Sequence, residues 1–170
     1  MKNLLICSLL VLGCAVFADT WRMEAEDFIT EGKWVKGKHS INYSGEYVMV
    51  STAAKSTLSG KYEIPKAGKY TVWVRTMTMG GNWRKGNISV NGKMSGEFGD
   101  APLKDGMKSG DWYWVNLGVF ELPAAEVDFK VISTKGYVRV DALVITDDAK
   151  YVPPAKVPEI NKIKALDIAI

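Results

Sequence analysis

Short segments in which apolar and polar residues alternate follow one another along most of the chain. The clearest is residues 69–78, where Tyr70, Val72 and Val74 occupy every second position. A period of two places successive side chains on opposite faces of a β-strand. Similar patterns predict strands at residues 21–28, 47–51, 58–64, 87–90, 93–98, 113–122, 126–133 and 137–146. No stretch longer than a few turns has the helical period.

Turn residues separate these segments. The pair Asn91-Gly92 lies between two predicted strands, which is typical of a type I′ hairpin. Residues 65–68 predict another turn, and residues 31–44, 79–86 and 99–110 predict surface loops. About nine short strands without intervening helices predict an all-β fold, an antiparallel β-sandwich of the jelly-roll type.

The first eighteen residues have the pattern of a signal peptide. Lys2 precedes an apolar run over residues 4–17, and Ala18 is a small residue at the expected cleavage site before Asp19. The run is shorter than the roughly 20 residues that a membrane-spanning helix needs. We therefore expect a secreted or periplasmic protein. The alternative is a lipoprotein signal, because Gly13-Cys14 would allow a lipid anchor on Cys14.

Cleavage at Ala18 leaves one predicted domain and a tail. The domain covers residues 19–152, and the Pro-containing tail covers residues 153–170. Both cysteines lie in the signal, so the mature chain has no disulfide. It also has no predicted transmembrane segment. The tail is expected to be disordered, and the alternatives are an amphipathic helix or a strand that binds a protein partner.

Composition removes several classes of function. The 170 residues include 22 basic and 19 acidic residues, and the basic residues form no stripe, so nucleic acid is not an expected partner. His39 is the single histidine. Neither a nucleophile-elbow motif nor a phosphate-binding glycine pattern accompanies it.

Three carboxylates are candidate metal ligands. Glu24 and Glu26 are two residues apart in a predicted strand and would share a face, and Asp141 lies in the last predicted strand, which could pair with the first. Carboxylates that converge repel one another unless a hard cation such as Ca²⁺ binds between them. The alternatives are solvated charges at a sheet edge and the acid pair of a hydrolase.

Several tryptophans are candidate ligand contacts. Trp83 lies in a glycine-flanked loop between Asn82 and Arg84, and Trp112 follows Asp111 at the start of a predicted strand. Flat aromatic faces on rigid loops suit the C–H faces of sugar rings, and neighbouring polar side chains can bind hydroxyl groups. Trp34 is a further candidate. Each tryptophan could instead fill the end of the core.

The order of these motifs resembles that of carbohydrate-binding modules of families 6 and 35. Residues 23–28 (Met-Glu-Ala-Glu-Asp-Phe) resemble the opening of these modules, and residues 44–48 resemble their turn into the second strand. Residues 64–75 are similar to their most specific strand motif, with a proline, an Ala-Gly pair and a final arginine. Residues 90–92 resemble their hairpin and residues 140–143 their closing strand. Residues 114–120 are also similar to golvesin-type domains.

The resemblance implies a non-catalytic jelly roll that binds a glycan. It also implies a structural Ca²⁺ held by Glu24, Glu26 and Asp141, and it favours Trp83, Arg84 and Trp112 as sugar contacts. The sequence departs from these families at Arg139, where an asparagine is often found.

Three functions are therefore open. The leading expectation is a carbohydrate-binding protein whose partner is a poly- or oligosaccharide. The second is an interaction domain without a sugar site, which docks through residues 160–170. The third is a small polysaccharide-degrading enzyme that uses carboxylate or Tyr/Arg chemistry.

Overall fold

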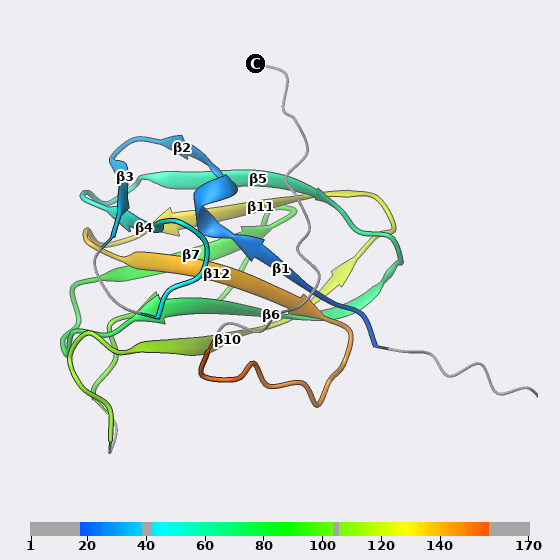
Figure 1. The fold of residues 1–170 in the computed structure, drawn as a ribbon. Helices are drawn as coiled ribbons and strands as arrows, with labels where there is room; N and C mark the ends of the chain where they lie inside the picture. Colours follow the sequence, from blue (N-terminus) through cyan, green and yellow to red (C-terminus); the bar gives the residue numbers. More distant parts are fainter. Residues whose placement is uncertain (1–17, 39–41, 104–105, 157–170) are drawn as a thin grey trace, which may run out of the picture.

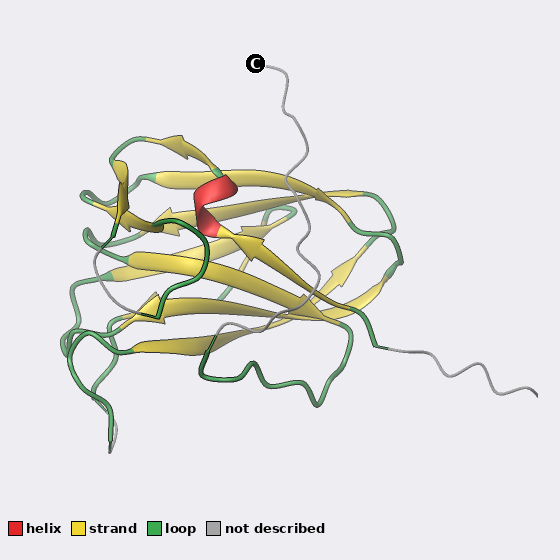
Figure 2. Cartoon of the chain, in the orientation of Figure 1, coloured by secondary structure: helices red, strands yellow, loops and turns green. Residues whose placement is uncertain are grey.

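A computed structural model shows the arrangement of the chain and describes residues 18–38, 42–103 and 106–156. The predicted signal peptide, apart from Ala18, lies outside the described residues, as do His39 and the tail beyond residue 156. The described residues form two antiparallel six-stranded sheets that face each other, with one short 3₁₀ turn (Figures 1 and 2). This confirms the predicted all-β sandwich.

The strand order of the first sheet is β10-β6-β12-β4-β3. Strand β1 pairs with residues 142–146 of β12. The second contains the order β2-β5-β11-β7-β8, and β9 pairs with β7. The strands of the first sheet are β1 (Thr20–Glu24), β3 (Trp34–Gly37), β4 (Val48–Ser51), β6 (Gly68–Met77), β10 (Trp112–Leu122) and β12 (Arg139–Thr146). Those of the second are β2 (Ile29–Glu31), β5 (Thr57–Glu63), β7 (Lys85–Val90), β8 (Lys93–Met94), β9 (Phe98–Gly99) and β11 (Glu126–Ser133).

The core lies between the sheets and follows the alternation of the sequence. Tyr70, Val72 and Val74 of β6 point inward and are fully buried, as are Phe129 and Val131 of β11. The first and last strands pair, as predicted, with Trp21 opposite Ile145. Burial of such side chains is the main source of stability in a fold without disulfides.

Two predicted elements differ from the structure. The segment at residues 21–28 is not one strand, because β1 ends at Glu24 and Ala25–Asp27 form the 3₁₀ turn η1. Glu24 and Glu26 therefore do not share a strand face. The predicted loop at residues 31–44 contains the edge strand β3, which pairs with β4. Short edge strands of this kind raise the total in the described residues from about nine to twelve.

The segment after β12 returns beside β10, the edge strand of the first sheet (Figure 1). Pro153 is buried there, the Trp114 indole Nε1–H donates to the Pro154 carbonyl at 2.9 Å, and Arg75 Nη2 donates to the Ala155 carbonyl at 3.0 Å. Trp114 lies opposite Arg75 in the β10–β6 pairing. Contacts with the sheet thus continue beyond residue 152, where the sequence predicts the start of a tail.

Candidate functional site

The end of the sandwich where β6 stops and β10 and β12 begin carries most of the predicted ligand residues (at the left in Figure 1). Two groups of side chains lie there. The loop before β7 presents Trp83, and the start of β10 presents Trp112. The Thr78 backbone N–H donates to the Asp111 carbonyl at 3.1 Å, which ties the two loops together.

Trp83 is an exposed aromatic side chain with a rigid backing. Half of its surface is accessible, although a tryptophan in a folded protein is usually well buried. The Arg84 guanidinium carbon lies 3.5 Å from the ring centroid, within the range of a cation–π contact. The Tyr137 ring meets the indole at 70° with centroids 5.9 Å apart. Tyr137 is itself half exposed, so the two rings form one open aromatic surface, which we call the Trp83 platform.

Arg84 is held in place by a buried carboxylate. Its Nη1 lies 3.3 Å from Asp100 Oδ1 and 3.2 Å from Oδ2, and Asp100 is fully buried. Asp100 Oδ1 also accepts the Met79 backbone N–H at 3.0 Å. Asp100 therefore holds both ends of the loop that carries Trp83, one through Arg84 and the other through the Met79 backbone. Arg84 was predicted as a ligand contact, and the structure places it beneath Trp83.

Arg139 lies near this pair and has buried donors without acceptors. Its Nε and Nη1 atoms are buried and have no hydrogen-bond partner among the described residues. Burial lowers the pKa of Arg139, the neighbouring Arg84 lowers it further, and Asp100 opposes the shift. Leaving such donors unbonded costs stability, and their burial keeps them out of reach of a ligand in this arrangement. Asn82 lies in the same loop as Trp83, and its backbone carbonyl accepts a hydrogen bond from Lys135 Nζ at 2.9 Å.

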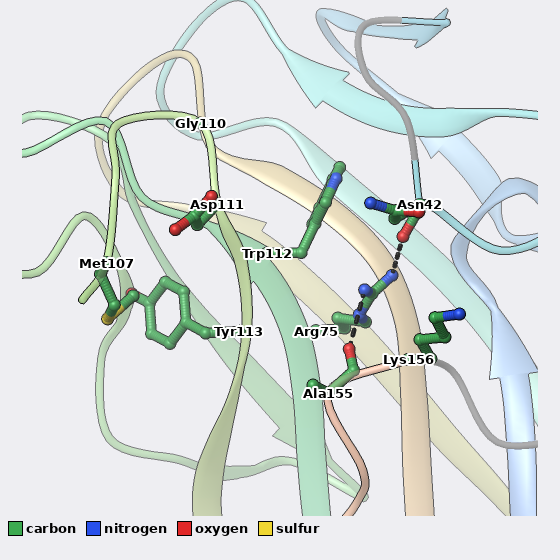
Figure 3. A pocket seen from close by; sticks show the side chains of 9 residues that line it. All are labelled: Asn42, Arg75, Met107, Gly110, Asp111, Trp112, Tyr113, Ala155 and Lys156. Carbon is green, nitrogen blue, oxygen red and sulfur yellow. Dashed lines mark hydrogen bonds between the residues drawn. The ribbon is translucent and has the colours of Figure 1, made fainter.

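Trp112 and Asp111 line a pocket of about 380 Å³ on the outer side of β6 and β10 (Figure 3). The Arg75 guanidinium lies 5.5 Å from the Trp112 ring centroid and donates to the Asn42 carbonyl at 2.7 Å. Asp111 Oδ2 accepts the Lys108 backbone N–H at 2.6 Å. The other residues of the pocket are Met107, Gly110, Tyr113, Ala155 and Lys156.

Trp34 does not join either group. It lies in β3 with 7% of its surface exposed and belongs to the hydrophobic core. The sequence predicted a surface loop at residues 31–44, with a core position for Trp34 as the alternative, and pairing of β3 with β4 places the side chain in the core. Burial of this kind is incompatible with sugar stacking on its face.

The three predicted metal ligands are occupied by donors of the protein. Asp141 Oδ2 accepts from Arg75 Nη1 at 2.6 Å, and Asp141 Oδ1 accepts the Ser44 backbone N–H at 2.9 Å. Glu24 pairs with Arg22 at 3.0 Å, and both oxygens of Glu26 accept backbone N–H groups of Glu46 and Tyr47. No group of three or more His, Cys, Asp or Glu side chains in the described parts of the chain is placed to hold a metal ion.

In this arrangement the residues do not fit a calcium ion. Ca²⁺ needs six to eight oxygen ligands, whereas N–H groups and a guanidinium point at these carboxylates. Burial raises the pKa of Asp141, and the Arg75 and Ser44 donors oppose that rise. We derive no step of the function from a metal.

Tyr137 and Asn42 were not among the predicted site residues, and Arg139 was noted only as a departure from the family pattern. Tyr137 adopts a left-handed backbone with φ +65° directly after Gly136, a turn that orients its ring toward Trp83. An aromatic residue beside glycine in a turn was the available signal. Asn42 contributes a backbone carbonyl, which no side-chain pattern reveals.

Comparison with known proteins supports the fold. No family model matches the sequence, and no curated protein matches it. Among solved structures, a family 35 carbohydrate-binding module from Clostridium thermocellum superposes with a TM-score of 0.62 at 17% identity, covering 75% of this chain and 97% of that chain. The C-terminal family 6 module of the laminarinase LamC from Zobellia galactanivorans gives a TM-score of 0.60 at 19% identity, covering 76% and 100%.

Some matching structures are whole enzymes. The family 35-containing β-(1,4)-mannanase of Podospora anserina gives a TM-score of 0.61 at 20% identity, and the match covers 80% of this chain but 29% of that enzyme. The chain therefore has the jelly-roll fold of family 35 and family 6 carbohydrate-binding modules. No helix in the part of the chain that the structure describes is long and apolar enough to cross a membrane.

Proposed function

We propose that this chain is a secreted, non-catalytic protein that binds a glycan at the Trp83 platform. The observation that carries the proposal is the half-exposed indole of Trp83, backed by Arg84 at 3.5 Å and flanked by Tyr137. An indole fixed in this way offers a large apolar face that loses little entropy on binding. The likeness of the fold to carbohydrate-binding modules supports the same function.

The polar groups around the platform suit sugar oxygens. The exposed Asn82 side chain lies next to Trp83 in the sequence and can bond to sugar hydroxyl groups. The pocket beside Trp112 lies at the same end of the sandwich and provides further polar groups for a longer chain. A site of this size with two stacking rings predicts a Kd between about 1 mM and 1 μM.

Binding without catalysis is supported by the state of the nearby carboxylates. Asp100 is buried against Arg84, and Asp111 accepts a backbone N–H from its own loop. A glycosidase needs two carboxyl groups that flank the scissile bond, and neither of these is placed to protonate a ligand on the platform. Incubation with polysaccharide should release no reducing ends.

Affinity electrophoresis tests the sugar site. The panel is mannan, laminarin, galactan and dextran, chosen from the activities named for the enzymes among the matching structures. We expect retention on one polysaccharide, and loss of at least about tenfold in affinity in Trp83→Ala and Tyr137→Ala. Met94→Ala, an exposed apolar side chain on β8, is the matched control and should bind normally.

Two results would reject the proposal. One is a folded protein that no polysaccharide retains. The other is Trp83→Ala binding as tightly as Met94→Ala. Export is tested separately by amino-terminal sequencing of the mature protein: a start at Asp19 supports secretion, and a lipid-modified Cys14 shows an anchored protein.

A further inference from the structure

Four charged side chains form a network on the outer side of the first sheet. Arg75 and Asp141 form an ion pair at 2.6 Å, with 2% and 0% of the side chains exposed. Arg22 and Glu24 form a second pair at 3.0 Å. The Ser44 hydroxyl lies 2.6 Å from Glu24 Oε2 and 3.1 Å from Asp141 Oδ1, so it joins the two pairs.

The network is electrically balanced. Two carboxylates face two guanidinium groups, and guanidinium stays protonated at every physiological pH. A buried carboxylate without a positive partner is strongly unfavourable, so the sheet needs a cation at this place. The arginines already supply it, and a divalent ion added between Glu24 and Asp141 would leave an excess of two positive charges in a buried region.

Arg75 also connects segments that are far apart in the sequence. Its Nη1 donates to the Asn42 carbonyl as well as to Asp141, and its Nη2 donates to the Ala155 carbonyl. Figure 3 shows the guanidinium between Asn42 and Ala155, beside Trp112. One planar group thus binds the loop before β4, the strand β12 and the segment after β12.

We propose that this domain holds no structural metal ion between Glu24 and Asp141, because Arg22 and Arg75 already pair with these carboxylates, so that its folding requires no divalent cation. Glu26 lies outside this network, because its oxygens accept backbone N–H groups of Glu46 and Tyr47. Arg75 also lines the pocket beside Trp112, but the tests of the inference measure stability and metal binding and do not depend on a glycan.

Thermal unfolding and calorimetry of the purified full-length chain test this inference. We expect equal melting temperatures in CaCl₂ and in EDTA, and no heat of binding when CaCl₂ is titrated. A melting temperature that falls in EDTA and recovers in CaCl₂ would overturn the proposal. So would a calcium-binding heat that Asp141→Asn abolishes.

Variants test the role of the guanidinium. Arg75→Met keeps an unbranched apolar stem but leaves Asp141 without its charged partner, and we expect its melting temperature to fall by roughly 10 °C. Lys61→Met removes an exposed ion pair with Glu126 and should change little. Arg75→Lys keeps the charge but loses the fork that reaches three acceptors, and should lie between them. An Arg75→Met protein as stable as Lys61→Met would contradict the proposal.

Discussion

The buried pair of Arg84 and Asp100 should control both stability and the Trp83 platform. Replacing Arg84 by Met removes the cation while keeping the apolar part of the side chain. Asp100 would then remain fully buried with one backbone N–H donor from Met79. Trp83 would also lose the guanidinium that lies 3.5 Å below its ring.

The geometry sets the size of the effect. Removing one partner of a buried ion pair costs about 3–5 kcal/mol. The Arg84–Asp100 distances of 3.2 and 3.3 Å are longer than the roughly 2.7–2.9 Å of a strong charge-assisted bond, so we expect the lower end, about 3 kcal/mol. For a chain of 170 residues, each kcal/mol lowers the melting temperature by about 2–4 °C. The expected fall is roughly 6–12 °C.

A double-mutant cycle separates the pair from other effects. Urea unfolding of the wild type, Arg84→Met, Asp100→Asn and the double variant should give a coupling energy of about 2 kcal/mol. Glycan affinity of folded Arg84→Met should fall as well, because the indole loses its backing. A coupling energy below about 0.5 kcal/mol would refute the argument that this pair holds the loop.

Four further results follow from the structure. Trp34→Ala should lose about 3–5 kcal/mol of stability, measured by urea unfolding, and should keep its glycan affinity, because Trp34 is a core residue. Asn82→Ala should weaken glycan binding in titration calorimetry without lowering stability, since its side chain is exposed beside Trp83. Burial, with a smaller effect of Asp100, raises the pKa of the Tyr113 hydroxyl from 10.0 to about 12. This tyrosine therefore ionises first in the unfolded chain, and the free energy of unfolding should fall as the pH rises from about 10 to 12. In urea unfolding, Tyr113→Phe should reduce that dependence on pH. A chain that ends at Val152 should melt at a lower temperature by calorimetry, because Trp114 and Arg75 lose the carbonyl groups of Pro154 and Ala155.

The sequence predicted the fold wherever a strand is long and alternates regularly. Tyr70, Val72 and Val74 gave β6, and the pair Asn91-Gly92 gave the hairpin, in which both residues have positive φ. The strand β3 was missed because four residues at a sheet edge carry little periodic signal. The alternation also continued through Ala25, although the backbone there forms a 3₁₀ turn.

The site was predictable only in part. Trp83 was identified correctly as an exposed indole, because a glycine-rich loop has no apolar neighbours to cover it. The roles of Arg84 and Asp141 depend on Asp100 and Arg75, which are distant in sequence and meet them only after folding. Long-range ion pairs of this kind leave no local pattern in the sequence, so neither pair could be predicted from it.

The most direct test of the proposed function observes the tryptophan side chains themselves. Indole N–H resonances are recorded by ¹⁵N-correlated NMR during titration with an oligosaccharide of the polysaccharide that the panel identifies, and Trp83→Phe assigns the Trp83 signal. We predict that the Trp83 resonance shifts with saturation while that of the buried Trp34 stays in place. A ligand that saturates the protein without moving the Trp83 resonance would contradict the account.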